Sequence, residues 1–134
     1  MKEIYPQLID SAINVMDTAY VPYSKFKVGA AILDENDQIH AGSNVENAAY
    51  PQGCCAEASA ISIMIAFGGK KIRAIAIASE SELLCTPCGG CRQRIREFSS
   101  LDTDIMICDR SGLKRTFSLG ELLPMSFGPE FLNS

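Results

Sequence analysis

The alternation that begins at Phe26 limits the possible folds more than any other feature of this sequence. Residues 26–33 alternate with a period of two, and the second face of that alternation changes from polar Lys27 to apolar Ala31 and Leu33. A strand with two apolar faces has to be covered on both sides. We therefore expect a sheet that lies between two other layers.

Helical and strand patterns alternate along the rest of the chain. Apolar residues recur at helical spacing over residues 5–20, 55–67 and 91–98, and strand patterns cover residues 26–33, 38–43, 72–78, 104–108 and, more weakly, 114–117. We find no linker, internal repeat or low-complexity stretch. The pattern predicts a single α/β domain over residues 1–134, a three-layer α/β/α sandwich with a mixed sheet of about five strands.

The expected helix over residues 55–67 has no polar side. Ala60, Ile61, Ile63, Met64 and Ile65 point around its whole circumference. A helix that is apolar all round has to be covered all round, and one sheet covers only one face. We expect a symmetry-related copy of the chain to cover the remainder.

Composition excludes several classes of partner. The 134 residues are 47% hydrophobic and carry a net charge of -4, so the chain can bury a core but lacks a broad basic surface for nucleic acid. The longest uncharged stretch, residues 58–69, is shorter than the roughly 20 residues of a membrane span. Glu3 and Pro6 stand where a secretory signal would have its apolar run, so we expect a cytoplasmic protein. Because the chain has no broad basic surface, we expect it to bind a small molecule in a pocket.

Cysteines in two segments indicate a metal site. Cys88 and Cys91 are two residues apart, Cys55 is a distant third, and each segment begins an expected helix, where free amides stabilise a thiolate. Three sulfur ligands leave tetrahedral zinc one open position for water, which is typical of a catalytic site. Glu57 is the natural proton carrier and must not bind the metal. Because positions i and i+2 do not share a helix face, we expect Cys55 in the first turn.

Other uses of the six cysteines remain possible at this point. Cys85, Cys88 and Cys91 also match part of an iron–sulfur motif, which Cys54 or Cys55 could complete. Alternatively, Cys85 or Cys54 could close a structural four-cysteine zinc site, and the protein would then be a binding module. An iron–sulfur cluster would leave Glu57 and the block at residues 44–46 unexplained.

Several residues also have simpler interpretations. Cys54 and Cys108 are expected to be small buried hydrophobes, and His40 is expected to be structural or on the surface. Arg92, Arg94 and Arg96 are interpreted as a solvated or intersubunit helix face.

Five blocks of the sequence resemble cytidine deaminases of the small, three-cysteine zinc class, in the same order and over nearly the whole chain. The blocks are YSKFKVGAA (23–31), NVENAAYP (44–51), CAE (55–57), PCGGCRQ (87–93) and LLPMSFGP (122–129). The resemblance implies a homotetrameric hydrolase of pyrimidine salvage that converts cytidine and 2′-deoxycytidine to the uridines and ammonia. A blasticidin-type aminonucleoside deaminase, whose zinc core is similar, is the second candidate.

The resemblance also implies roles for individual residues. One zinc ion per subunit would be held by Cys55, Cys88 and Cys91, with Glu57 as the proton shuttle. The substrate would be bound by Asn44 and Glu46 at the ribose, Phe26 on the pyrimidine face, the Ala56 backbone at the cytosine edge, and Tyr50 and Phe127 in composite sites between subunits. Without the family resemblance, composition favours Phe26 as a core residue at the start of a strand, and Asn44 and Glu46 could be turn residues.

The sequence departs from the family pattern at Ala58. The family usually has an arginine directly after Cys-Ala-Glu, where it can offset the net charge of about -1 of zinc with three thiolates. Our hypothesis is that the two helix amino termini and Arg92 compensate through hydrogen bonds to the sulfurs.

Overall fold

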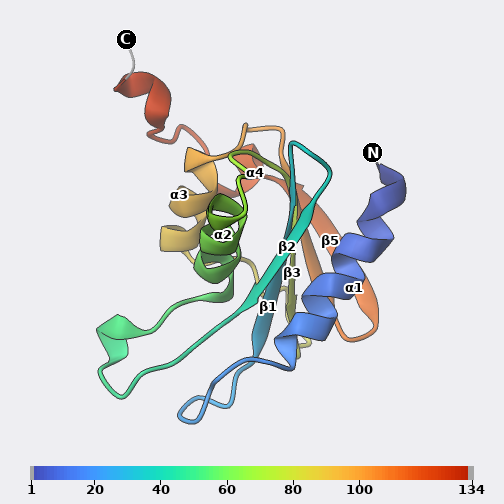
Figure 1. Ribbon diagram of the computed structural model, residues 1–134, viewed down its shortest axis with the longest axis vertical. Helices are drawn as coiled ribbons and strands as arrows, with labels where there is room; N and C mark the ends of the chain where they lie inside the picture. Colours follow the sequence, from blue (N-terminus) through green and yellow to red (C-terminus); the bar gives the residue numbers. More distant parts are fainter. Residues whose placement is uncertain (1, 133–134) are drawn as a thin grey trace.

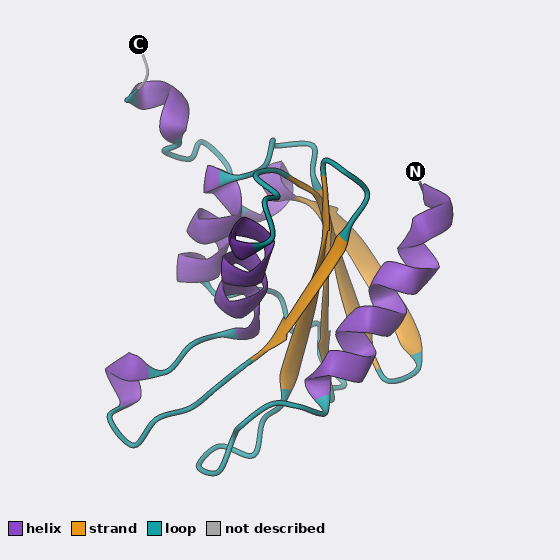
Figure 2. Cartoon of the chain, viewed as in Figure 1, coloured by secondary structure: helices purple, strands orange, loops and turns teal. Residues whose placement is uncertain are grey.

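The computed structural model describes residues 2–132, and its centre is a five-stranded mixed sheet between helical layers (Figures 1 and 2). The strands lie in the order β2-β1-β3-β4-β5. Their bounds are β1 Val28–Asp34, β2 Ile39–Ser43, β3 Ile72–Ser79, β4 Asp104–Asp109 and β5 Gly112–Ser118. The helices are α1 Tyr5–Met16, α2 Ala56–Ala66, α3 Gly89–Glu97 and α4 Leu119–Leu122, with 3-10 turns at Lys2–Ile4, Tyr50–Gln52 and Pro129–Phe131.

The strand directions confirm the predicted mixed sheet. β1 is antiparallel to both β2 and β3, and β4 is antiparallel to β5. β3 and β4 are parallel, with Ile75 opposite Ile105. A parallel pair needs a long crossover connection, which here contains α3.

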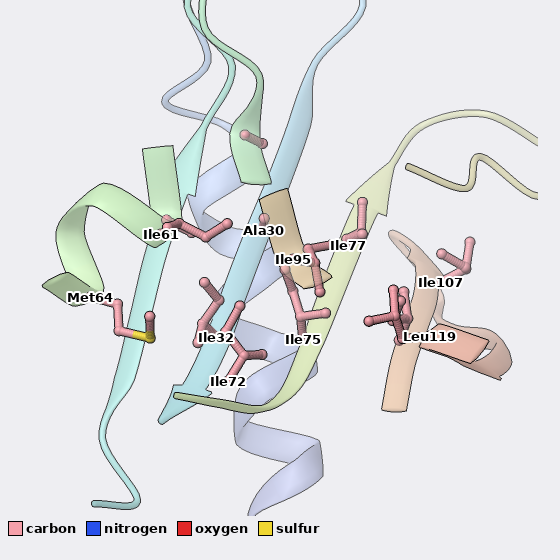
Figure 3. Packing of buried hydrophobic residues seen from close by; sticks show 13 residues of the cluster. Ala30, Ile32, Ile61, Met64, Ile72, Ile75, Ile77, Ile95, Ile107 and Leu119 are labelled. Atoms are coloured by element: carbon pink, nitrogen blue, oxygen red, sulfur yellow. The ribbon is translucent and has the colours of Figure 1, made fainter. Parts of the chain in front are cut away.

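Both faces of β1 are buried, as its sequence predicts. Ala30 and Ile32 belong to the core layer under α2 and α3, whereas Ala31 and Leu33 belong to the layer under α1. Figure 3 shows the first of these layers, in which Ile95 of α3 lies among the isoleucines of β3. β1 therefore has α1 packed on one face and α2 and α3 on the other.

Two glycines allow helices to approach the sheet closely. A Cβ on Gly29 would lie 2.8 Å from the backbone nitrogen of Met16 in α1. A Cβ on Gly42 would lie 2.7 Å from the backbone nitrogen of Ala60 in α2. Real Cβ atoms essentially never approach that closely, so each helix depends on the missing methyl group.

Helix α1 ends earlier than its apolar periodicity predicts. The helix stops at Met16, whereas Tyr20 is 58% exposed and forms an isolated bridge with Val45. The backbone amide of Tyr20 donates to Asn44 rather than to the helix. Here a long-range backbone pairing overrides a local periodicity.

Helix α2 is only partly covered within one chain. Met64 is fully buried, but Ile65 and Phe67 are 45% and 79% exposed. Within residues 2–132, no helix has the length and apolar character needed to cross a bilayer.

Candidate active site

Two helix amino termini meet on the same side of the sheet and carry the motif cysteines. Cys55 is the N-cap of α2 and Cys88 is the N-cap of α3, and both have extended backbone conformations. Cys91 lies in the first turn of α3 and is fully buried. The sequence placed Cys55 in the first turn, and the structure places it one residue before the first helical residue.

Three of the candidate residues form a tight cluster. The sulfurs of Cys55 and Cys91 and a carboxylate oxygen of Glu57 all lie within 4.8 Å of one another. Two sulfurs bound to the same tetrahedral zinc at about 2.3 Å would be about 3.8 Å apart, so the donor types and spacing fit zinc. Cys88 lines the same cavity but lies outside the 4.8 Å cluster, so its role as a ligand stays a prediction.

The titration of these groups reflects burial and mutual contact. Burial raises the pKa of Glu57, which is 5% exposed, to about 7, and the nearby Cys55 acts in the same direction. A hydrogen bond from the Cys91 thiol lowers the pKa of Cys55 to about 6, assisted by the Ala58 amide and the charge of Arg94. The pKa of Cys91 is raised because its proton is the one donated.

The cation at the sulfurs is not the one that we expected. Arg94 Nη1 is 3.4 Å from Cys91 Sγ and 3.8 Å from Cys55 Sγ. Arg92 instead donates to the carbonyls of Pro87 and Leu122, so the prediction that Arg92 compensates the thiolates is wrong.

Arg96 does not lie on a solvated face, so that part of our interpretation of the α3 arginines is wrong for this residue, whereas Arg94 is exposed as expected. Arg96 is only 8% exposed and donates to Ser126 and to both carboxylate oxygens of Glu130. Gln93 donates to the carbonyl of Phe127. Helix α3 therefore anchors the segment after α4, and the sequence carried no periodic signal of these contacts.

The cavity beside the cluster contains most of the predicted substrate residues. Its volume is about 340 Å³, and Asn44, Glu46, Tyr50, Ala56 and Glu57 are among its lining residues. Phe26 and Phe127 are not among them, and these side chains are 41% and 56% exposed.

Asn44 and Glu46 also have a structural task that sequence reasoning missed. The Asn44 side chain accepts from the amide of Val28 and donates to the carbonyl of Phe26, both at 2.9 Å. Glu46 accepts from the amides of Tyr23 and Ser24. Together they hold the backbone of the segment before β1, which includes Phe26.

The remaining cysteines and His40 lie outside the cluster. Cys108 is buried, as predicted, but Cys54 is exposed, so the expectation that it is a buried hydrophobe is wrong. Cys85 lines the cavity without joining the 4.8 Å cluster. His40 is structural: it is 7% exposed, and its Nε2 lies 2.7 Å from Asp34 Oδ2.

A mixed sheet that presents cysteines at two helix amino termini, beside a buried carboxylate, is typical of α/β domains that bind zinc. Comparison with known proteins narrows that class. Residues 2–107 match the family model of the cytidine and deoxycytidylate deaminase zinc-binding region. The chain belongs to the cytidine and deoxycytidylate deaminase family.

Individual relatives agree with the family match over most of the chain. A cytidine deaminase from Halalkalibacterium halodurans is 37% identical over 126 residues, which are 94% of this chain and 96% of that relative. A probable cytidine deaminase from Dictyostelium discoideum is 38% identical over 98% of this chain and 88% of its own.

Solved structures confirm the predicted fold. The crystal structure of cytidine deaminase from Burkholderia pseudomallei matches with a TM-score of 0.86 and 37% identity, covering 92% of this chain and 98% of that one. Cytidine deaminase from Mycobacterium tuberculosis matches with a TM-score of 0.81 and 34% identity, covering 92% and 97%.

Proposed function

We propose that this protein is a zinc-dependent hydrolase that deaminates cytidine and 2′-deoxycytidine to uridine and 2′-deoxyuridine, with release of ammonia. One observation carries the proposal: the buried Glu57 carboxylate lies within 4.8 Å of the sulfurs of Cys55 and Cys91. The cavity beside them, at about 340 Å³, has the size of a small-molecule site. The relatives named as cytidine deaminases support the choice of substrate.

The roles of the site residues follow from their chemistry. Cys55, Cys88 and Cys91 would hold zinc, which when bound supplies the Lewis acidity that makes water a nucleophile near neutral pH. Glu57 takes a proton from the attacking water and delivers it to ring atom N3. A bond forms from the water oxygen to C4, the C4–N4 bond then breaks, and a second proton passed through Glu57 leaves with the amine as ammonia.

Substrate contacts are assigned to residues in and around the cavity. Asn44 and Glu46 bind the ribose hydroxyls, and the Ala56 backbone binds the polar edge of cytosine. Phe26 stacks on the pyrimidine from the segment that Asn44 positions. No cation lines this cavity among the described residues, which favours a nucleoside over a nucleotide.

The quaternary structure that we propose is a homotetramer with composite sites. Ile65 of α2 and Phe67, which follows the helix, are exposed in the single chain, and a second copy would bury them. Tyr50 and Phe127, which are 76% and 56% exposed, would then complete a site together with the neighbouring subunit. We place the protein in the cytoplasm, in pyrimidine salvage, where its thiols stay reduced.

The test combines metal content with turnover. Purified wild-type protein should contain one zinc per subunit and convert cytidine and 2′-deoxycytidine, but not blasticidin, in a spectrophotometric assay. Glu57→Gln should keep its zinc and lose about 10²- to 10⁴-fold in turnover, the range for a general acid–base residue. Glu97→Gln, the same change on an exposed residue of α3, is the matched control and should retain activity.

Two results would count against this function. Equal turnover in wild type and Glu57→Gln would remove Glu57 as the proton shuttle. Loss of zinc in Cys85→Ala would indicate a closed four-cysteine structural site, whereas retained zinc and turnover support the open site.

A further inference from the structure

The negative charge of the zinc site requires a nearby positive charge, and the residues that directly follow Cys55 in the sequence do not provide one. This inference rests on the zinc site proposed above. Zinc with three thiolates carries a net charge of about -1, and a partly buried net charge is costly unless opposite charge lies close to it. The residue after Glu57 is Ala58, which brings no charge.

Arg94 brings a positive charge to the sulfurs from the other helix. Its Nη1 is 3.4 Å from Cys91 Sγ and 3.8 Å from Cys55 Sγ, so one guanidinium nitrogen reaches sulfurs that start from α3 and α2. Cys91 and Arg94 are three residues apart on α3, and this spacing places them on the same helix face.

The local packing leaves space for this guanidinium. Ala58 and Arg94 line the same surface cavity of about 410 Å³, so the small side chain of Ala58 leaves room for the longer one. A Cβ on Gly90 would lie 3.4 Å from Arg94 Nη1, at the lower limit of ordinary van der Waals contact. Small residues therefore border Arg94 on two sides.

The other two arginines of α3 are engaged elsewhere. Arg92 donates to Thr86 and to the carbonyls of Pro87 and Leu122. Arg96 pairs with Glu130. Of these three arginines, Arg94 is the one directed at the cysteines.

We propose that Arg94 is a positioning residue of the zinc site, which offsets the thiolate charge and orients Cys55 and Cys91 from helix α3. It contacts the sulfurs and acts on the reaction only through them. An arginine at position 58 would enter the same cavity, so the charge can be supplied from either helix, but only one of the two positions is charged here.

The primary test is zinc retention, which is independent of catalysis. Zinc affinity is measured by competition with a chromophoric chelator for wild type, Arg94→Gln, Arg94→Lys and the control Arg115→Gln. Arg115 lies on β5 against the Phe117 ring, and its substitution changes the net charge equally. Arg94→Gln should bind zinc about tenfold more weakly. Loss of a residue that contacts metal ligands weakens metal binding by about 10- to 100-fold, and we expect the lower end of that range because Arg94 is exposed. Arg94→Lys should recover part of the loss, and Arg115→Gln should match wild type.

Two further measurements distinguish an effect of Arg94 on the thiolate charge from a purely structural role: the spectrum of the cobalt-loaded protein, and a variant in which the arginine is moved to position 58. In the cobalt-loaded protein, Arg94→Gln should shift the sulfur-to-metal charge-transfer band to lower energy, because the thiolates lose a neighbouring positive charge. The metal-free variant should keep the melting temperature of the metal-free wild type. The double variant Ala58→Arg/Arg94→Gln should restore zinc affinity and band position towards wild type.

The possible outcomes distinguish this inference from the proposed function. Unchanged zinc affinity and band position in Arg94→Gln, with a wild type that binds zinc and deaminates cytidine, overturn the role of Arg94 alone. A wild type that neither binds zinc nor turns over cytidine overturns the proposed function itself. An equal loss in Arg115→Gln would show a general charge effect and would also overturn the inference.

Discussion

Replacement of Gly42 by alanine tests whether the contact between β2 and α2 positions the active site. The added Cβ would lie 2.7 Å from the nitrogen of Ala60 and 2.8 Å from the Cβ of Ser59, in the helix that Cys55 and Glu57 begin. Ordinary contacts begin near 3.4 Å, so strand and helix must separate by about 0.6–0.7 Å. Overpacking of this kind costs about 1–3 kcal/mol, which lowers the melting temperature of a domain of this size by about 4–12 °C.

The same displacement should reduce activity. A 1 Å misplacement of reacting groups can cost about 10²-fold, so a shift of about half that size should cost about tenfold in kcat/KM. Melting is followed by circular dichroism at a fixed protein concentration, and kcat/KM for cytidine is measured on zinc-loaded protein well below the melting temperature.

Gly29→Ala is the matched comparison on the opposite face of the sheet. Its Cβ would collide with Ala12 and Met16 of α1, which contributes no residue to the site. Because this overlap is larger than the one at Gly42, we expect a loss of stability at least as large, with kcat/KM near wild type. The reasoning is refuted if Gly42→Ala retains both its melting temperature and its kcat/KM, or if Gly29→Ala loses as much activity as Gly42→Ala while still folded.

Two further predictions concern ion pairs away from the zinc site. Arg96→Gln should release the segment after α4, because the buried guanidinium binds Ser126 and Glu130. Limited proteolysis should then cleave this segment several-fold faster than in the wild type. Unchanged cleavage would contradict the anchoring role. Burial works against the Asp34 carboxylate, but hydrogen bonds from His40 and two amides outweigh it and hold its pKa below the ordinary 3.8. The stability that Asp34 contributes is thus present above pH 3.8 and lost as the pH falls through that value towards the lower folded pKa. Urea unfolding from neutral pH to about pH 3 should show a shallower acid loss for Asp34→Asn, and equal slopes would count against it.

The order of the elements could be predicted because their patterns are local. The largely apolar run at Ile72–Ser79 indicates a buried strand from its own residues, and the apolar periodicity of α2 indicates a helix, although only part of that helix is buried in the single chain. The end of α1 could not be predicted, because Tyr20 continues the helical spacing while its amide pairs with Asn44, a residue distant in sequence. Helix α4 was missed because it is four residues long, although Ser118 and Glu121 form its capping box.

The site divides in the same way between local chemistry and long-range contact. Cys55, Cys91 and Glu57 were identifiable because cysteine at a helix start and a carboxylate two residues later have specific chemistry. Helical spacing could also have favoured Arg94 over Arg92, because a residue three positions after Cys91 shares its helix face and the next residue does not. The approach of Arg94 to Cys55, which starts the other helix, could not be predicted because it depends on the packing of α3 beside α2.

By itself, the sequence determined the two-sided sheet, the helices that cover it, and the cysteines and acid that can serve zinc, because periodicity and side-chain chemistry depend on neighbouring residues. The tertiary structure decided where α1 stops, that Arg94 also reaches the Cys55 sulfur, and how Asn44 and Glu46 hold the segment that carries Phe26. Those outcomes depend on which backbone groups and charges come into contact after the helices pack onto the sheet. Contacts between residues far apart in sequence leave no pattern in the local sequence around either residue.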